Sequence, residues 1–276
     1  MEEILLPGGV GNAGLVTKVG DTVRRPWRPA TAATHALLAH LNEVLPGVAP
    51  VPLGRDEQGR EVLSFLEGEV AVPPFPKWVA GEEFLISLGQ LLRRIHDVLE
   101  TWRQPSGLEW SDQIPDPHGG PLIVHSDICP ENVIARGGRA VAIIDWEFAA
   151  PGRRIWDVVS TARRCVPFTA PARRNPIYGD MDVTDRLRGF LDAYGLAAAD
   201  RREFTQVLDQ RRAVGERFTR RRIALGETAF AEKWGTSAGE RRFALEREWV
   251  RDVPTDIATH HGSGPISQHD HDYLLS

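Results

Sequence analysis

Two apolar runs near the middle of the chain each end in an acidic side chain, and this feature constrains the fold most. The run "LIVHSD", residues 122–127, reaches Asp127 after three apolar positions, and "AVAIIDWE", residues 140–147, reaches Asp145 in the same way. Both runs have the composition of buried strands, and a buried strand avoids a carboxylate that has no cation or proton to meet. We therefore expect two strands that deliver their carboxylates to a metal site or a proton-transfer site.

Length and composition indicate an ordinary globular protein of one large domain or two lobes, with 276 residues and 42% hydrophobic side chains. The formal net charge of -5 argues against nucleic acid as a partner. Two cysteines are too few for a disulfide framework or a thiolate zinc site, which favours a reducing compartment. The sequence lacks an apolar run near the roughly 20 residues that span a bilayer. We expect a soluble cytoplasmic protein without a membrane partner, and assign no oligomeric state.

The order of strand and helix patterns predicts an α+β chain. An alternating run turns at Gly20 and Asp21, a helical pattern covers residues 31–47, and two further strand patterns flank the turn at residues 56–59. After the proline-rich segment 72–77 the helical period dominates. Helices are expected over residues 82–102, and in three runs after residue 182 that cover residues 184–195, 201–226 and 238–252. The tail from about residue 259 has little periodicity.

A glycine-rich segment near the N-terminus fits the pattern G-x-G-x-x-G-x-V through Gly9, Gly11, Gly14 and Val16. A dinucleotide-binding turn requires a helix after the glycines, and here a strand pattern follows. A P-loop requires G-K-[ST], and Leu15 follows the last glycine instead. Two interpretations remain, a glycine-rich hairpin that covers nucleotide phosphates and a tight turn without a ligand.

The acidic segments also fit a spacing with a chemical meaning. His125, Asp127 and Asn132 form H-x-D-x-x-x-x-N, the spacing of a kinase catalytic loop, and Asp145 follows in the next run. Asp127 is placed to accept or orient the proton of an attacking hydroxyl. Asn132 offers a neutral oxygen and Asp145 a charged one, which are the ligand types that magnesium prefers. The spacing therefore predicts phosphoryl transfer.

The blocks "HSDICPENV" and "AIIDWEFAAPGRRIWDVV" resemble those of the aminoglycoside phosphotransferase and choline kinase family of small-molecule kinases, and looser similarity extends from about residue 7 to residue 168. The resemblance implies an α+β, two-lobed protein-kinase-like fold. A nucleotide-binding lobe would cover residues 1–66, and a catalytic and substrate-binding lobe would cover residues 67–276. It also implies ATP or GTP as the phosphoryl donor, Mg²⁺ as cofactor and a small-molecule hydroxyl as acceptor.

The same resemblance implies a role for particular side chains. Asp127 matches the catalytic aspartate, and His125 matches the histidine that braces the catalytic loop. Asn132 and Asp145 match the magnesium ligands. Three further positions correspond to family features, namely the aspartate that anchors the catalytic loop and the hinge that meets the adenine: Asp157, Ser64 and Leu66.

Two departures from the family pattern affect the prediction. The phosphate-binding lysine of the family is missing. Arg25 is a better candidate than Arg24 to reach the phosphates in its place, because Arg25 shares a strand face with apolar Val23. The helix that should present a glutamate to this cation has Thr34 near the expected place. A pseudokinase or nucleotide-binding regulatory module is therefore the alternative to an active kinase. A protein kinase is disfavoured, because "IDWE" replaces D-F-G and A-P-E is absent.

The acceptor is predicted from charge alone. Between residues 153 and 251 arginine and lysine outnumber aspartate and glutamate, and Asp180, Asp182 and Asp185 form one small acidic cluster. Polycationic aminoglycosides require an acidic surface. We therefore expect a neutral or at most singly positive acceptor.

Overall fold

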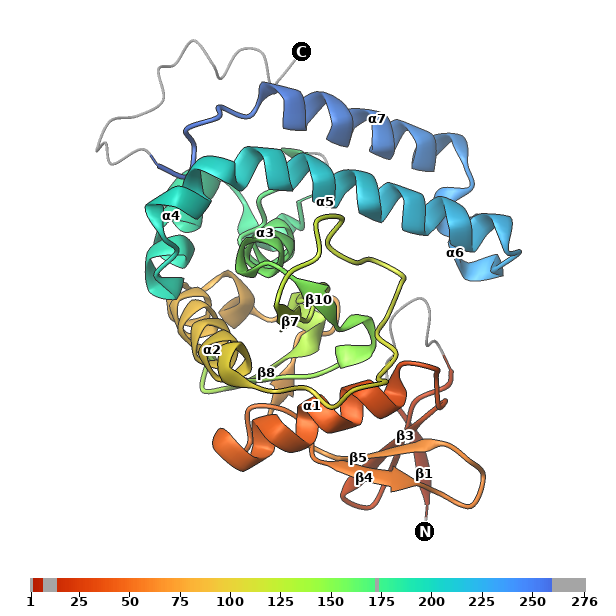
Figure 1. Cartoon of the computed structure of the whole chain (residues 1–276). Coiled ribbons are helices and arrows are strands. Elements are labelled where there is room, and N and C mark those ends of the chain that lie inside the picture. Colours follow the sequence, from red (N-terminus) through yellow and green to blue (C-terminus); the bar gives the residue numbers. More distant parts are fainter. Residues whose placement is uncertain (1, 7–13, 172–173, 260–276) are drawn as a thin grey trace.

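The computed structural model describes residues 2–6, 14–171 and 174–259. An antiparallel sheet with one helix is followed by a mainly helical lobe, so the predicted α+β, two-lobed fold class is confirmed (Figure 1). The predicted lobe boundary after residue 66 stays a prediction. The elements of the first part are β1 (Glu3–Leu5), β2 (Thr17–Val19), β3 (Thr22–Arg25), α1 (Thr31–Val44), β4 (Pro52–Arg55) and β5 (Glu61–Ser64).

The first sheet has the strand order β1-β2-β3-β5-β4, with antiparallel neighbours throughout. The predicted hairpin at Gly20 and Asp21 is confirmed, since Val19 pairs with Thr22 across the turn. The predicted turn between β4 and β5 also forms, and the Asp56 carboxylate accepts hydrogen bonds from the backbone N–H groups that follow it. The register of β3 and β5 places Arg25 opposite Glu61, a pair that matters for the site.

The rest of the chain begins with short strands and continues as helices. Its strands are β6 (Glu69–Val70), β7 (Leu122–Val124), β8 (Val133–Arg136), β9 (Arg139–Ile143) and β10 (Ala150–Gly152). Its α-helices are α2 (Glu82–Thr101), α3 (Arg154–Cys165), α4 (Val183–Tyr194), α5 (Ala198–Ala224), α6 (Thr228–Trp234) and α7 (Ser237–Asp252). Single 3₁₀ turns are η1 (Lys77–Ala80), η2 (Pro130–Asn132), η3 (Trp146–Phe148) and η5 (Pro176–Tyr178).

Helix α2 is the central support of the helical lobe. It buries leucine and isoleucine side chains at three- and four-residue spacing, and Glu82 and Glu83 in its first turn favour the helix N-terminus. Gly89 permits α4 to approach closely, because a Cβ at this position would lie 3.0 Å from the Phe190 carbonyl oxygen. Helix α4 is capped by Asp182, whose carboxylate accepts from two N–H groups, and ends at Gly195, with φ of 72°.

Two small sheets carry the predicted catalytic segments. Strand β8 pairs with β6 and β9, and β7 pairs with β10, all antiparallel. The two apolar runs that end in acidic residues are therefore strands, as predicted: one is β7 and the other is β9. Both are mostly buried in one hydrophobic core that extends from α1 through α2 and α3 to α5. The catalytic segments thus start from rigid, buried positions.

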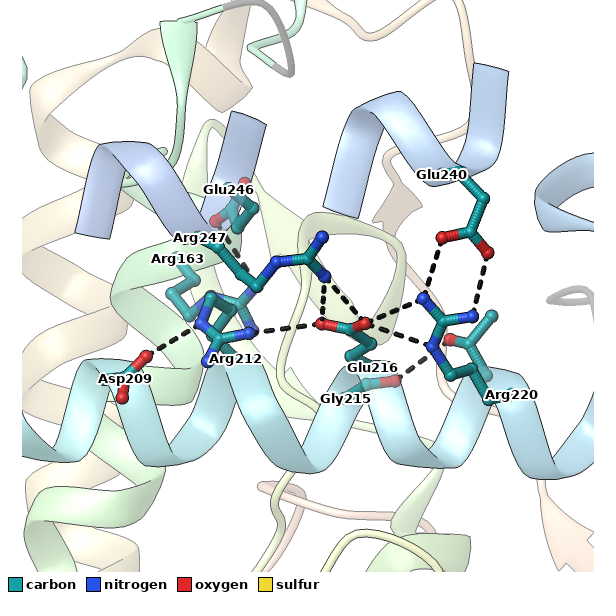
Figure 2. A network of polar contacts seen from close by, with 10 residues as sticks. Arg163, Asp209, Arg212, Gly215, Glu216, Arg220, Glu240, Glu246 and Arg247 are labelled. Atoms are coloured by element: carbon teal, nitrogen blue, oxygen red, sulfur yellow. Dashed lines mark hydrogen bonds and ion pairs between the residues drawn. The ribbon is translucent and has the colours of Figure 1, made fainter. Parts of the chain in front are cut away.

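The outer helices are fixed to each other by ion pairs. Helix α5 lies over α3, and α7 lies along the other side of α5 (Figure 1). Glu216 of α5 accepts from Arg212 and Arg220 of the same helix and from Arg247 of α7, as Figure 2 shows. Arg220 also reaches Glu240 of α7. Within the described ranges, no helix is both long and apolar enough to cross a membrane.

Candidate active site

The loop after β7 is held by a buried carboxylate on α3. The Asp157 side chain is 1% exposed and accepts hydrogen bonds from the backbone N–H groups of His125 at 2.8 Å and Ser126 at 2.7 Å. Burial opposes its charge, but the hydrogen bonds from His96 and from the His125 N–H hold the pKa of Asp157 below its ordinary value. Asp157 is thus the loop anchor that the sequence predicted.

His96 extends this anchor to two more helices. Its Nε2 donates to Asp157 at 3.2 Å, and its Nδ1 accepts from the Tyr194 hydroxyl at 2.7 Å. One buried chain of polar contacts therefore joins α2, α3 and α4 below the loop. Burial raises the pKa of Tyr194 to about 12, so its hydroxyl remains a donor at neutral pH.

His125 lies inside the loop and its side chain is fully buried. Its Nε2 donates to the Ile144 carbonyl at 2.9 Å, and its Nδ1 accepts from the Asp127 N–H at 3.2 Å. The ring also packs against Trp146, with 4.7 Å between the centroids. His125 therefore connects the segment after β7 to the segment after β9. Its contacts are those of a brace for the loop.

Two backbone positions at the site adopt an unusual conformation. Ser126 has φ of 69° and Asp145 has φ of 63°, and no other non-glycine residue in the described ranges has positive φ. Such conformations cost free energy and tend to occur at functional sites. At Ser126 the cost is offset by the bond to Asp157, so the fold enforces a backbone path that turns Asp127 outward from the buried strand.

Asp127 and Asn132 are linked within the loop. The Asn132 side-chain amide donates to the Asp127 carbonyl at 3.0 Å, and the Asn132 carbonyl accepts from the Ile144 N–H. The Asp127 carboxylate is 36% exposed, in contrast to the buried residues around it. Cys129 between them is buried, and this burial raises the pKa of its thiol, so it is a packing residue rather than a nucleophile.

Arg25 lies in a buried ion-pair network at the end of β3. Its Nη1 contacts the Asp145 carboxylate at 2.7 Å, and its Nε bonds to Glu61 on β5. His35 of α1 contacts the other oxygen of Glu61 at 3.0 Å. Burial opposes the charge of Glu61, but His35 and Arg25 outweigh it and hold the pKa of Glu61 below its ordinary value.

This network supplies the carboxylate that the helix lacks. Thr34 of α1 bonds back to the Ala30 carbonyl of its own helix. The partner of Arg25 comes instead from the neighbouring strand, as Glu61. The neighbouring Arg24 points elsewhere, with contacts to Thr22 and Asp56. Of the two candidate arginines, Arg25 faces Asp145.

The glycine-rich segment is described only in part. Gly9 and Gly11 lie outside the described residues. Gly14 is exposed with φ of 75°, a conformation that favours glycine, and the Val16 carbonyl accepts from the Leu6 N–H at 2.9 Å. Its role in nucleotide binding stays a prediction.

The hinge positions differ in what they offer a ligand. The Ser64 N–H donates to the Val51 carbonyl, and its hydroxyl accepts from the Val51 N–H. These groups are therefore engaged inside the sheet. For Leu66, no main-chain hydrogen bond forms within the described part of the chain, and its side chain is half-buried. The predicted contact of these positions with an adenine stays a prediction.

The described residues contain no cluster of three or more His, Cys, Asp and Glu side chains that would bind a metal unaided. A magnesium ion in a kinase needs less than such a cluster, because it keeps several waters and takes further oxygens from the nucleotide phosphates. One carboxylate at Asp145 and one amide oxygen at Asn132 fit that requirement. Asn132 directly precedes β8 and Asp145 closely follows β9, and the core holds both strands in place.

Three residues of the site were not found from the sequence. They are Glu61, which pairs with Arg25, His96, which supports Asp157, and Arg211 of α5, which contacts the catalytic loop. A charged residue at the start of the apolar run "EVLSF" was the available signal for Glu61. For His96 and Arg211 the partners are distant in sequence, and helical periodicity alone does not reveal them.

Comparisons with known proteins agree with this geometry. A sequence model of the phosphotransferase enzyme family matches residues 98–194. The chain is 34% identical over 223 residues to the trifolitoxin immunity protein of Rhizobium leguminosarum bv. trifolii, with 75% of this chain and 79% of that protein covered.

Solved kinase structures share the fold. An amicoumacin kinase in complex with AMP-PNP, Ca²⁺ and Ami has a TM-score of 0.59 and 13% identity, and the match covers 92% of this chain and 89% of that one. A choline/ethanolamine kinase family protein from Mesorhizobium loti has a TM-score of 0.54 and 17% identity, with coverage of 90% and 93%. At these identities the structures establish the fold alone.

Proposed function

This chain belongs to the phosphotransferase enzyme family of aminoglycoside phosphotransferases and choline kinases, and from that premise we propose that it transfers the γ-phosphoryl group of Mg-ATP to a hydroxyl of a small molecule. Membership of this family alone supports a small-molecule kinase. The proposal of γ-phosphoryl transfer rests on the hydrogen bonds made by Asp157, His125 and Asn132. These bonds fix the two segments that carry Asp127 and Asp145.

In this proposal Asp127 orients the acceptor hydroxyl and takes its proton. The carboxylate is partly exposed, while the backbone on either side is fixed by Asp157 and His125. Phosphoryl transfer requires mainly positioning and charge stabilisation, because its transition state is loose. A braced loop that leaves the Asp127 carboxylate accessible meets this requirement.

Asp145 and Asn132 are the proposed holders of Mg²⁺, which would bridge the phosphates and neutralise charge that develops on them. Arg25 lies beside Asp145, and its guanidinium contact at 2.7 Å holds that carboxylate in place. Because Glu61 in turn holds Arg25, the chain has a complete cation-carboxylate pair at this position. This pair weakens the case for an inactive nucleotide-binding module, since the missing helix glutamate was its main support.

The charges near Asp127 favour an acceptor that is not a polycation. Arg211 lies 3.8 Å from the Asp127 carboxylate, and Arg164 lies 3.9 Å from Glu131, four residues further on. Burial and the like charges of Arg164 and Arg242 lower the pKa of Lys233 on α6, so these cations lie near one another.

Two of the three acidic residues that were candidates to line the acceptor pocket have other contacts. Asp182 caps α4, and Asp185 forms an ion pair with Arg188 at 2.6 Å. We therefore propose a neutral or at most singly positive acceptor. A toxin with a hydroxyl group is one candidate, because the relative from Rhizobium leguminosarum is named as an immunity protein.

The proposal is tested by a coupled ADP-release screen with Mg-ATP across hydroxyl compounds, among them choline, ethanolamine, homoserine, sugars and antibiotics. Wild type is compared with Asp127→Asn and with Asp252→Asn, which changes an exposed aspartate at the end of α7. We expect at least one compound to stimulate wild type and Asp252→Asn but not Asp127→Asn. Tight ATP binding without stimulated release by any compound would favour the regulatory module.

A further inference from the structure

A buried arginine from the outer helical layer reaches the catalytic loop. Arg211 of α5 is 6% exposed. Its Nη2 donates to the Ser126 carbonyl at 3.0 Å, and its Nε donates to the Ser160 hydroxyl of α3 at 2.9 Å. The same Nη2 lies 3.8 Å from the Asp127 carboxylate. The guanidinium also faces the Trp156 ring, with 5.8 Å to its centroid.

Burial of the Arg211 guanidinium is unfavourable for the stability of the fold. Removal of a guanidinium from water costs several kcal/mol unless a close carboxylate compensates, and the direct hydrogen-bond partners of Arg211 are neutral oxygens. Burial accordingly lowers the pKa of Arg211, with partial compensation by Asp127. A costly charge that is retained next to a catalytic group points to a role in the reaction rather than in folding.

Ser126 is held from both sides as a result. Asp157 binds its N–H at 2.7 Å, and Arg211 binds its carbonyl. These two contacts enclose the residue with positive φ that directly precedes Asp127. A shift of the guanidinium would therefore change the backbone orientation from which the Asp127 side chain projects.

We propose that Arg211 is a positioning residue for phosphoryl transfer, which holds the Ser126 carbonyl and faces the Asp127 carboxylate so that α5 sets the orientation of Asp127. This inference rests on the proposed function. Helix α5 is a firm platform for the task, because the Glu216 network fixes its other side to α7 (Figure 2).

A glycine on the same helix leaves space for this guanidinium. Gly215, labelled in Figure 2, follows Arg211 by one helical turn, and a Cβ at this position would lie 3.2 Å from Arg211 Nη1. Glycine inside a helix destabilises it relative to alanine. At Gly189 of α4, by contrast, an added Cβ would meet nothing within 4 Å. The chain thus offers a matched pair of glycine positions.

The first experiment compares wild type with Arg211→Met and Arg211→Lys. ADP release from Mg-ATP is measured with water as the acceptor, together with the dissociation constant for Mg-ATP. In Arg211→Met we expect turnover to fall by about 10- to 100-fold while that dissociation constant changes by less than about twofold, because only the orientation of Asp127 is lost. Arg211→Lys should recover part of the turnover, since it keeps the charge and one donor.

The second experiment separates positioning from stability. Gly215→Ala should leave the melting temperature unchanged or higher, yet lower turnover by about 2- to 10-fold, because the new methyl group displaces Nη1. Gly189→Ala should raise stability without loss of turnover. This comparison remains decisive if Arg211→Met does not fold.

Two results would overturn the inference, and they are distinguishable. Full turnover in folded Arg211→Met or in Gly215→Ala, with Asp127→Asn inactive, would refute the role of Arg211 and leave the proposed function intact. Turnover with water that is equal in wild type and Asp127→Asn, or no stimulation of wild-type ADP release by any compound of the screen, would refute the proposed function, and the role of Arg211 would fall with it.

Discussion

Replacement of Glu61 by glutamine tests the strand-borne partner of Arg25. Glu61 is 1% exposed and bonds to Arg25 and to His35. Glutamine has nearly the same shape and keeps one acceptor oxygen, so the change removes charge with little effect on packing. The variant therefore isolates the electrostatic contribution of this pair.

The structure sets the expected size of the effect. Loss of one partner from a buried ion pair costs about 3–5 kcal/mol, because the remaining charge stays buried. Arg25 retains its contact with Asp145 at 2.7 Å, so we expect the lower end, about 3 kcal/mol. For a chain of this size that loss corresponds to a melting temperature lower by about 6–12 °C.

The pH dependence gives a second, independent readout. The pKa of Glu61 is lowered in the folded protein, so its contribution to the free energy of unfolding is complete above the unfolded pKa, about 4.3. That contribution is lost as the pH falls through the folded pKa. The difference in stability between wild type and Glu61→Gln should therefore shrink on acidification below about pH 4.3.

The assay is thermal unfolding at a series of pH values, with Glu57→Gln as control. Glu57 is an exposed glutamate in the turn just before β5, and its replacement should leave stability unchanged. The reasoning is refuted if Glu61→Gln unfolds at the same temperature as Glu57→Gln at neutral pH. A stability difference that grows on acidification would also contradict it.

Three further predictions concern the metal, the loop and the acceptor. Mg-ATP at about 100 times its dissociation constant should stabilise wild type by about 2.7 kcal/mol, and Asp145→Ala should abolish most of this gain in a thermal scan; equal gains with and without magnesium would contradict the assignment. Ser126→Gly should raise the free energy of unfolding by about 1 kcal/mol in denaturant titrations, because glycine relieves the positive φ and removes a buried hydroxyl that has no hydrogen-bond partner among the described residues. Kanamycin and streptomycin should stimulate ADP release poorly, and micromolar Michaelis constants that rise with salt would show the expectation to be wrong.

The parts of the fold that the sequence predicted have local signals. Strands β7 and β9, helix α2 and the hairpin at Gly20 each show their period over a few consecutive residues. Helix α3 was not predicted: nine of its twelve residues are buried, and polar Asp157, Ser160 and Thr161 are among them, so residue polarity alone does not mark its buried face. Helix α6 was missed for a simpler reason, since its seven residues are too few for a period to emerge.

The candidate site likewise has residues with a local sequence signal and residues without one. The spacing of His125, Asp127 and Asn132 is local and was sufficient to predict the catalytic loop. The partners Glu61 and Arg211 could not be predicted locally, because their contacts join residues 36 and 85 positions apart. Glu61 became visible only through the register of β3 and β5, where it lies opposite Arg25. Tertiary pairing, rather than residue type, carries that information.

The central claim, that Asp127 is the catalytic carboxylate of a small-molecule kinase, is tested most directly by transfer of labelled γ-phosphate from Mg-ATP in Asp127→Asn. Binding of Mg-ATP, measured by calorimetry on the same preparation, should remain nearly equal to wild type, because the change keeps the shape of the loop. The rate of transfer should fall by about 10² to 10⁴ if Asp127 acts as a general base. Transfer at the wild-type rate with normal nucleotide binding would contradict the claim.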